Sequence, residues 1–376
     1  MSMTHRECLR RVLAGEATEW APNYELGCWA QTVDRWLAEG LPSDASYIGR
    51  LNMFEGEPLL GLDRRAFCHL DNRMDPLFEP AVLEETDRYL TARHANGIVT
   101  KALKEGTVRG QRMSMDTYLD FPVKDAATWA DMKRRYANPR ALWRYPFWLD
   151  EQARLWRGRD YPVCLMGNAS FGLYSQLRSW VGTEALSYLF YDEPTLIDDM
   201  LQTATDFFLE LIEPVLGMVQ FDYFNFFEDC AGKGSCLYGP QTYRRFFKRH
   251  YERIIRRLNA AGIASIWLDC DGTPTPLVGC WMDSGINCLW PLEQASGMDP
   301  REIRRQFGPK LVLAGGIDKR ELTKGRAAIR RELEAKIPPL LEQGGYIPHI
   351  DHTFPPDISY DNMMYYMELK RKLIGR

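Results

Sequence analysis

Residues 263–272 read Ile-Ala-Ser-Ile-Trp-Leu-Asp-Cys-Asp-Gly, an apolar run that ends in two carboxylates at a glycine. The run 264–268 predicts a buried strand, because it is short, apolar and bounded by turn residues. Side chains alternate along a strand, so Asp269 and Asp271 point the same way and Cys270 points the other way. Acids at the end of a buried strand are costly to desolvate unless they are paired or bind a ligand. The stretch predicts a site there, with simple capping of the following helix as the alternative.

The composition excludes several classes of protein. The chain has 376 residues, 45% of them hydrophobic, which is ample for the core of a globular enzyme. A net charge of −4 argues against nucleic acid or an anionic membrane as the main partner. The sequence has no apolar run long enough to span a membrane and no apolar core of a signal peptide near its start. Nine cysteines without paired spacing indicate reduced thiols and a cytoplasmic protein.

The second half of the chain repeats a pattern of strand, polar loop and helix. This alternation predicts a parallel sheet, and with two further strands in the N-terminal half it predicts an α/β fold, a closed (β/α)8 TIM barrel. A doubly wound open sheet is the alternative, but no Gly-x-Gly-x-x-Gly follows the first strand. We expect one domain over residues 1–376, with residues 1–95 as an N-terminal helical and loop elaboration. The six predicted strands are 161–167, 222–227, 264–268, 285–290, 311–314 and 344–350.

The first half of the chain is less regular. Residues 98–102 and 108–113 look like strands around Glu105-Gly106. Arg109 and Arg112 lie here near Ser114 and Asp116, and they are either a grip for a substrate carboxylate or solvated arginines on a hairpin. Apolar periodicity and capping residues predict helices at 4–15, 29–39, 128–136, 195–216, 241–261, 324–335 and 360–374.

A barrel would bring several acids and one histidine to the carboxyl ends of its strands: Glu228, Asp269, Asp271, Glu293, Asp318 and His352. Each has a structural alternative. Glu228 and Asp229 either face the substrate or cap the loop 231–234. Asp318 is better explained as a helix N-cap than as a catalyst. His352 is either functional or held by its neighbour, and Tyr174 is a candidate wall residue of the site.

Four motifs give a resemblance to a known family. They are Phe-Glu-Asp-Cys-Ala-Gly at 227–232, Asp-Gly-Thr at 271–273, Leu-Ala-Gly-Gly-Ile-Asp at 313–318 and His-Thr-Phe-Pro-Pro-Asp at 352–357. In this order and spacing the chain resembles the uroporphyrinogen decarboxylase superfamily from about residue 100 onward. The resemblance implies a TIM barrel with its site at the carboxyl ends of the strands.

The superfamily has two branches, and one of them fits poorly. True decarboxylases carry an N-terminal Arg-Gln-Ala-Gly-Arg stretch that holds the carboxylates of the tetrapyrrole. The corresponding stretch here, Tyr-Glu-Leu-Gly-Cys-Trp at 24–29, has no arginine. Because bidentate arginine pairing is the usual way to hold carboxylates, decarboxylation of uroporphyrinogen is disfavoured.

The other branch, the cobalamin-dependent methyltransferases, binds zinc through His-x-Cys on one strand and a late cysteine. Alignment on the Gly272 turn places those ligands at Asp269 and Asp271, with the late one close to His352. The resemblance therefore implies a zinc site of Asp269, Asp271 and His352, with Cys270 as a substitute ligand. The metal-free alternative gives acid/base work to Glu228, Asp271 and His352.

We therefore expect a methyltransferase that moves a methyl group between an O- or N-methyl substrate, such as a methoxylated aromatic, and cobalamin. The chain lacks an Asp-x-His-x-x-Gly motif, so the cobalamin would come on a separate corrinoid protein. Substrate contacts are expected from Arg112, Tyr174 and Asp229. The alternatives are a decarboxylase of a small acid that uses Arg109 or Arg112, and a non-enzymatic protein that binds a tetrapyrrole or corrinoid.

Overall fold

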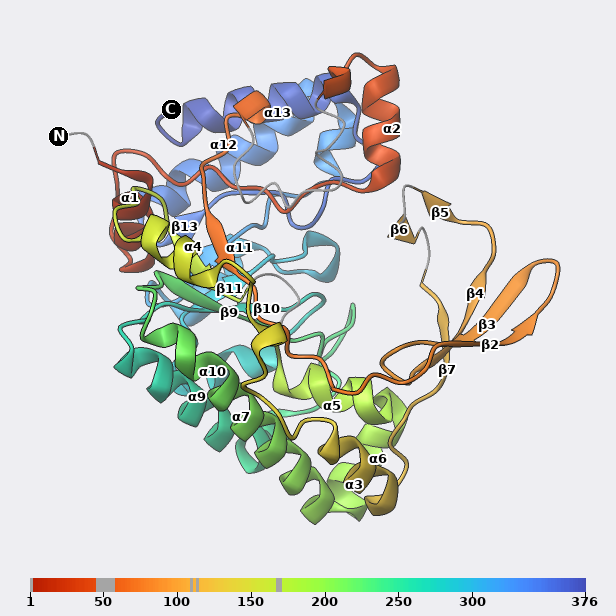
Figure 1. Cartoon of the computed structure of the whole chain (residues 1–376). Helices are drawn as coiled ribbons and strands as arrows, with labels where there is room; N and C mark the ends of the chain where they lie inside the picture. The colour runs from red at the N-terminus through yellow and green to blue at the C-terminus, as the bar shows by residue number, and fades with distance from the viewer. Residues whose placement is uncertain (1–2, 45–57, 109–110, 113–114, 167–170) are drawn as a thin grey trace.

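The computed structural model describes residues 3–44, 58–108, 111–112, 115–166 and 171–376. Its centre is a curled sheet of seven strands, all parallel (Figure 1). The six strands predicted from residue 161 onward are all present in it. In spatial order the strands are β1 (Ala66–Cys68), β8 (Val163–Leu165), β9 (Tyr223–Phe227), β10 (Ile266–Asp269), β11 (Cys288–Trp290), β12 (Val312–Ala314) and β13 (Tyr346–Ile347).

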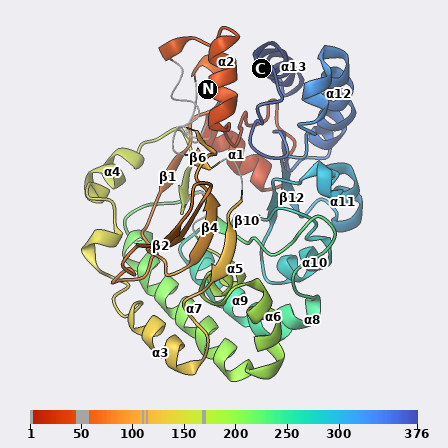
Figure 2. The same cartoon turned by 90° about the vertical axis from the view of Figure 1, so that its right-hand side faces the viewer.

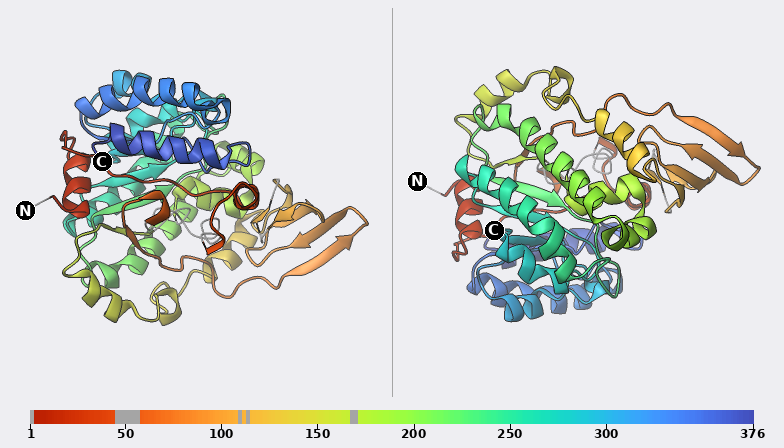
Figure 3. Two further views of the ribbon diagram at one scale, coloured as in Figure 1. Left: turned by 90° about the horizontal axis from the view of Figure 1, so that it is seen from above. Right: turned by 90° about the horizontal axis from the view of Figure 1, so that it is seen from below.

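Helices cover the outer face of this sheet (Figures 1 and 3). Each connects one strand to the next, as parallel pairing requires. The connecting helices include α5 (Leu173–Val181), α6 (Thr183–Asp192), α7 (Pro194–Leu216), α9 (Lys248–Ala260), α10 (Thr275–Asp283), α11 (Pro300–Phe307) and α12 (Arg326–Glu342), and α13 (Tyr360–Leu373) follows the last strand. Within the described ranges, none of the helices has the length and apolarity needed to cross a bilayer.

Alternation along the strands separates two cores. On β9, Phe224 and Phe226 pack in the core under the helices, whereas Tyr223 belongs to a second cluster on the inner side of the curl. By the same alternation Asn225 and Phe227 point inward. The inner cluster contains Tyr24, Cys164, Tyr223, Trp267, Cys288, Trp290, Val312, Ala314 and Ile347. The interior is therefore filled with side chains, as in packed barrels.

Helix α1 (His5–Leu13) lies at the amino-terminal end of the sheet and buries its apolar side against the inner cluster. A capping box starts it, because Thr4 and Glu7 exchange hydrogen bonds. Arg6 Nε and Arg10 Nε each donate to Oδ1 of Asp222 over 2.8 Å, next to the start of β9. These contacts hold α1 across the amino-terminal end, so a ligand would reach the interior from the carboxyl end.

The segment 22–29 bonds to both edges of the sheet. The backbone N–H of Asp63, just before β1, donates to the carbonyl of Asn23 over 3.0 Å. On the other side, the N–H of Phe354 donates to the carbonyl of Gly27 over 2.9 Å, and Cys28 and Phe354 form a parallel bridge. This segment thus fills the gap between β1 and the chain that follows β13.

A second, antiparallel sheet projects from the body as an arm (Figures 1 and 3). Its order is β2 (Ala81–Glu85), β3 (Tyr89–Arg93), β4 (Val99–Leu103) and β7 (Thr117–Asp120). In the view of Figure 2, β2 and β4 stand in front of the curled sheet. A separate two-stranded pair, β5 (Thr107–Val108) with β6 (Gln111–Arg112), lies within the arm.

Two sequence interpretations of this region were wrong. The predicted strand 98–102 is present as β4, but it pairs with β3 and β7 rather than across Glu105-Gly106. Residues 66–68 fall in a stretch that looked irregular, yet they form β1 of the parallel sheet. Helices α2 (Ala30–Ala38) and α3 (Ala126–Arg134) agree with the predicted helices 29–39 and 128–136 within a few residues.

Candidate functional site

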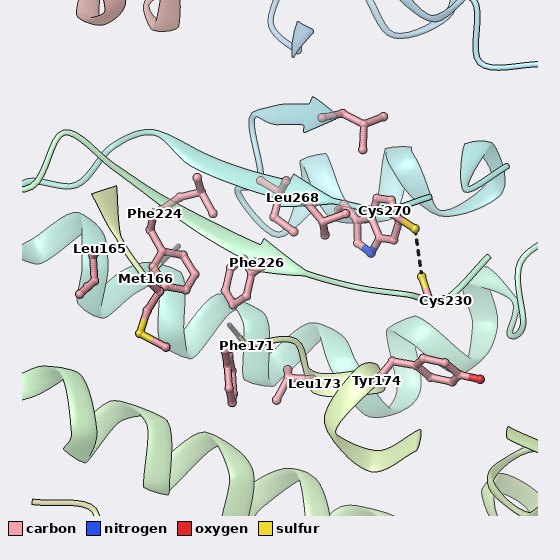
Figure 4. Close-up of a cluster of buried hydrophobic side chains, with 14 of the residues drawn as sticks. Leu165, Met166, Phe171, Leu173, Tyr174, Phe224, Phe226, Cys230, Leu268 and Cys270 are labelled. Atoms are coloured by element: carbon pink, nitrogen blue, oxygen red, sulfur yellow. Dashed lines mark hydrogen bonds between the residues drawn. The ribbon is translucent and has the colours of Figure 1, made fainter. Parts of the chain in front are cut away.

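The carboxyl ends of β9 and β10 lie side by side and bring most of the predicted acids together. In the register of the sheet, Asp269 pairs with Phe227 on β9 and with Trp290 on β11. Partners in a parallel register point to the same side, so these three side chains share the inner face. Cys270 points outward, where its Sγ lies 3.7 Å from Sγ of Cys230 (Figure 4). The alternation predicted for 269–271 therefore separates the acid from the thiol.

Asp269 is the most unusual of these acids. Asp269 is 8% exposed. Among the described residues its carboxylate has neither a hydrogen bond nor an ion pair. Burial, and next the negative charges of Asp271 and Asp229, raise the pKa of Asp269 well above its ordinary value. Burial without a partner therefore favours the protonated form of this carboxyl group, which is the form that can donate a proton.

Asp271 and His352 meet at the rim. Nε2 of His352 lies 3.5 Å from Oδ2 of Asp271, with 26% and 43% of the two side chains exposed. The ring of His352 also stacks on the indole of Trp29, with centroids 6.4 Å apart and planes at 15°. The pairing supports the sequence-based placement of these residues at one mouth, and their exposure keeps them open to solvent.

Glu228 is fully buried and faces the start of α5 rather than the solvent. Its carboxylate accepts the backbone N–H of Tyr174 over 3.0 Å and that of Ser175 over 2.9 Å. The hydroxyls of Ser175 and Tyr251 also donate to it. Burial raises the pKa of Glu228, and the hydrogen bonds oppose that rise. These contacts are those of a group that holds a helix N-terminus in place.

Asp229 is tied to the same helix. Arg178 donates to its carboxylate and to its carbonyl, each over 2.6 Å. The backbone N–H of Asp229 donates to the hydroxyl of Ser175 over 2.8 Å. The predicted substrate contact at Asp229 therefore coincides with a residue whose charge is already paired. The acid still acts at a distance, because its charge helps to raise the pKa of Asp269.

Tyr174 lies behind the site wall. It is 1% exposed and packs on Tyr238, with ring centroids 4.8 Å apart. Figure 4 shows it at the start of α5 among the buried side chains. Its hydroxyl is buried without a hydrogen-bond partner in the described structure, and burial raises its pKa.

A cavity of about 660 Å³ opens between the carboxyl ends of β8 and β9, the start of α5 and the base of the arm. Gly172 lines it, and only glycine fits there, because a Cβ would lie 1.7 Å from the carbonyl oxygen of Phe227. The size suits a small ligand. Its lining comprises Asn72, Arg73, Met74, Leu77, His94, Ala95, Asn96, Tyr136, Phe171, Gly172, Ser175, Gln176, Ser179 and Phe227.

Arg112 lies on the arm, and its guanidinium is engaged there. It donates to Asp116 over 2.8 Å, to the carbonyl of Leu103 over 3.0 Å and to the hydroxyl of Thr107 over 3.2 Å. The arginine therefore stabilises the arm, and it is not among the residues that line the cavity. Arg109 and Ser114, named with it in the sequence, lie outside the described residues.

The remaining predicted acids hold loops at the carboxyl end. Glu293 accepts the backbone N–H of Gly272 over 3.0 Å, which fixes the turn after Asp271. Asp318 accepts the backbone N–H of Arg320 over 2.9 Å and pairs with its side chain, so it holds the turn before the short helix η7 (Glu321–Lys324). The N-cap of that helix is Arg320, and not Asp318 as the sequence had predicted. Asp351 accepts the backbone N–H groups of Gln294 and Lys319 rather than contacting its neighbour His352.

The residues proposed as zinc ligands do not form a complete set. Asp271 and His352 lie close enough to share an ion. Throughout the part of the chain that the structure describes, however, no three His, Cys, Asp or Glu side chains are grouped so that they could hold a metal. Structural and catalytic zinc sites use at least three protein ligands. The donor set as arranged does not fit zinc.

One polar residue of the site was missed in the sequence. Asn225, in the middle of β9, is 3% exposed and points to the inner face. Its Oδ1 accepts a hydrogen bond from Nε1 of Trp290 over 2.8 Å, while its Nδ2 is buried without a partner in the described structure. The sequence did contain an indication, because Asn225 lies between Phe224 and Phe226 in a predicted buried strand. Burial of a polar side chain is costly unless it forms a hydrogen bond.

The family described as uroporphyrinogen decarboxylase (URO-D) matches residues 113–373. A solved structure described as a methyltransferase from Methanosarcina mazei is similar over 99% of each chain, with a TM-score of 0.60 and 15% sequence identity. At that identity the likeness concerns the fold. Among curated proteins, no sequence matches the chain.

Proposed function

Because the chain belongs to the uroporphyrinogen decarboxylase family, we propose that it is a methyltransferase component acting at the carboxyl end of a (β/α)8 barrel. In this proposal it moves a methyl group between a small O- or N-methyl substrate and cobalamin carried by a partner corrinoid protein. The corrinoid is a co-substrate that accepts or supplies the methyl group. The nine cysteines are all free thiols, which fits the reducing cytoplasm in which such a reaction would run.

The observation that carries the proposal is the buried ion pair formed by Glu25 in segment 22–29. Glu25 is fully buried there, accepts a hydrogen bond from the hydroxyl of Tyr366 over 2.6 Å and pairs with the ammonium of Lys370 over 2.5 Å. In true decarboxylases the corresponding segment carries arginines that hold the carboxylates of the substrate. In this chain the segment instead carries Glu25, which forms an internal ion pair with Lys370. A substrate rich in carboxylates would find no counter-charge in this segment, which favours the methyltransferase branch.

Asp269 has the properties of the acid that such a reaction needs. When a methyl group leaves an ether or amine, the bonding electron pair stays on the oxygen or nitrogen, which then takes up one proton. In this proposal Asp269, a buried carboxyl group whose pKa is raised, supplies that proton. In this proposal Asp271 and His352, which pair at the rim, return a proton from solvent to Asp269 after each turnover.

The cavity supports a small substrate. Its volume of about 660 Å³ lies within the range of small-molecule sites. Phe171 and Phe227 contribute aromatic surface, and Ser175 and Gln176 contribute polar groups. This mixture suits a methoxylated aromatic compound better than a large macrocycle.

The test uses free cob(I)alamin in place of the unidentified partner. Methoxybenzene, methanol and trimethylamine are offered separately as donors, and methylcobalamin formation is followed by absorbance. We expect turnover with at least one donor and at least a 100-fold lower rate in Asp269→Asn, in keeping with loss of a general acid. Asp283→Asn, which removes an exposed acid at the end of α10, is the matched control and should retain the rate. Absence of methyl transfer in both directions would overturn the proposal.

The two alternatives from the sequence gain no support from these contacts. A decarboxylase that holds its substrate through Arg112 would have to break the pairing with Asp116. A corrinoid-binding protein without activity would bind cob(I)alamin tightly and leave every donor unchanged in the same assay.

A further inference from the structure

The turn 94–97, which joins β3 to β4 at the base of the arm, forms part of the cavity wall. Three of its four residues line the cavity. Within the turn, the backbone N–H of Gly97 donates to the carbonyl of His94 over 2.8 Å. From outside it, the N–H of Phe78 donates to the carbonyl of Ala95 over 2.9 Å. These bonds hold the side chain of His94 in a fixed place beside the cavity.

The contacts of His94 show which of its ring nitrogens carries the proton. Its Nε2 lies 2.8 Å from Oγ1 of Thr100, and that hydroxyl lies 3.4 Å from Oδ2 of Asp116. The carboxylate of Asp116 is paired with Arg112. An ionised carboxylate can only accept hydrogen bonds, so the hydroxyl of Thr100 donates to it. The oxygen of Thr100 is then the acceptor for His94, which places the proton of the neutral ring on Nε2.

The second nitrogen, Nδ1 of His94, is available to a ligand. Within the described part of the chain, no group forms a hydrogen bond with it. His94 is exposed and lines the cavity, so a ligand has room to approach the ring. In the neutral ring Nδ1 is an acceptor. The chain of hydrogen bonds from Nε2 to a carboxylate makes Nδ1 a stronger acceptor, because bonds in such a chain polarise one another.

The hydroxyl groups on the facing wall of the cavity are already engaged. The hydroxyl of Ser175 donates to Glu228 over 3.0 Å and accepts a backbone N–H over 2.8 Å. The hydroxyl of Ser179 donates to the carbonyl of Gln176 over 2.7 Å and accepts from its side-chain amide over 3.2 Å. Both serines thus donate and accept within the protein, whereas Nδ1 of His94 does neither.

We propose that His94 selects ligands that carry a free hydroxyl group, which donates a hydrogen bond to Nδ1. This inference rests on the proposed function and narrows its substrate class to small methylated compounds that also carry a hydroxyl group. The O–H of an alcohol or phenol supplies the donor that Nδ1 needs. An ether oxygen has lone pairs only, so it would face the lone pair of Nδ1 without a proton between them.

Binding of phenol and of methoxybenzene, measured by calorimetry with the full chain and no corrinoid, tests the inference. The two molecules differ in one group, because methoxybenzene has a methyl group in place of the hydroxyl proton. Apolar contact alone would favour methoxybenzene through its extra methyl group. We expect the opposite order, with phenol bound at least tenfold more tightly. Equal or tighter binding of methoxybenzene would overturn the inference without any variant being made.

His94→Gln is the sharper variant. Glutamine can place an amide N–H where Nε2 lies and keep the contact with Thr100, but it has no acceptor in the position of Nδ1. We expect phenol binding to weaken about tenfold or more, the effect of one hydrogen bond, while methoxybenzene binding stays within about twofold. A merely structural role would weaken both ligands alike, and that outcome would overturn the inference.

His5→Gln is the matched control. His5 begins α1, at the amino-terminal end of the sheet, and its side chain is partly exposed. The substitution makes the same chemical change away from the cavity, so both ligands should bind as they do to wild type. Loss of the phenol preference in this control would overturn the assignment to His94.

NMR of wild-type protein with isotope-labelled histidine keeps the inference falsifiable if His94→Gln does not fold. The signals of His94 are assigned through the backbone. We expect its proton on Nε2 and a shift of its Nδ1 signal as phenol saturates the protein. A proton on Nδ1 of the neutral ring, or an Nδ1 signal that phenol leaves unchanged, would overturn the inference.

The outcomes separate this inference from the proposed function. Phenol affinity unchanged in His94→Gln would overturn the role of His94, even if methyl transfer to cobalamin is observed. If methyl transfer fails in both directions while the phenol preference depends on His94, the hydroxyl-binding site stands and the proposed reaction falls.

Discussion

Oε1 of Glu228 accepts the backbone N–H of Tyr174 over 3.0 Å, so the end of β9 is joined to the first turn of α5. Ser175 and Tyr251 add three further donors to the same carboxylate. Every hydrogen bond that this carboxylate accepts therefore belongs to the scaffold that carries the cavity wall, which includes Gly172 and Ser175.

Glu228→Gln should destabilise the protein by about 2–3 kcal/mol, because an amide N–H would replace an acceptor that faces several donors. Urea unfolding followed by circular dichroism measures the change. Glu342→Gln, at the exposed end of α12, is the control and should have little effect. A variant of normal stability that has lost turnover would instead restore the acid/base role first predicted for Glu228.

Asp222→Asn should cost about 3–5 kcal/mol at neutral pH, because it leaves the buried guanidinium of Arg159 without its counter-charge. Burial would raise the pKa of Asp222, but hydrogen bonds from Arg6, from the Val163 N–H and from Arg159 outweigh it and lower the pKa below its ordinary 3.8.

A lowered pKa in the folded state gives stability that is complete above pH 3.8 and is lost as the pH falls through the folded value. Unfolding measured at pH 7 and again near pH 3 should show the difference between wild type and Asp222→Asn shrinking at the lower pH. An equal difference at both values would contradict the ionic role assigned to Asp222 at the foot of α1.

Asp269→Asn should show the opposite dependence. Burial, then Asp271 and Asp229, raise the folded pKa of Asp269 above its ordinary 3.8. Folding therefore takes up a proton, and wild-type stability falls as the pH rises from 3.8 toward the folded value. The variant cannot titrate, so its stability relative to wild type should increase as the pH rises from 4 to 8. Thermal unfolding across that range, with Asp283→Asn as the control, measures it.

Zinc content of protein purified without chelator tests the metal prediction made from the sequence. Asp271 and His352 provide two donors, and the described residues add no third to the group. We expect zinc far below one equivalent by elemental analysis, unchanged in Asp271→Ala and His352→Ala. About one equivalent that disappears in both variants would establish the site that the sequence resemblance implied.

Much of the fold was predictable from the sequence because its strands are apolar runs that end in polar turns. Strands β9 and β10 illustrate this, each being a short buried run before an acid. Strand β1 was not predictable, because only three residues form it and Arg64 and Arg65 precede it. Arg65 is nevertheless buried, with its guanidinium 3.7 Å from the ring centroid of Tyr24. Two neighbouring arginines, which in the sequence are typical of a surface loop, thus precede a buried strand, and Arg65 is stabilised by an aromatic ring that is distant in the sequence.

The candidate site was predictable in position but not in the roles of its residues. The strand ends indicated that Asp271 and His352 would lie at one mouth, and in the structure these two side chains are 3.5 Å apart. Whether an acid faces a cavity or a helix N-terminus depends on which groups donate hydrogen bonds to it. The donors to Glu228 are more than 20 residues away along the chain, so the sequence around Glu228 does not reveal them. Asn225 was not predicted, because the indole N–H of Trp290 that donates a hydrogen bond to its side chain belongs to a strand two positions away in the sheet.

The arm has a consequence for how such proteins diversify. Its four strands pair with one another and not with the curled sheet, yet His94 and Asn96 at its base line the cavity. A gene segment of moderate length thus encodes part of the pocket without encoding any strand of the scaffold. Exchange, lengthening or loss of that segment would alter which molecules fit while every register of the parallel sheet stays intact, so new specificities can arise here at little cost to folding.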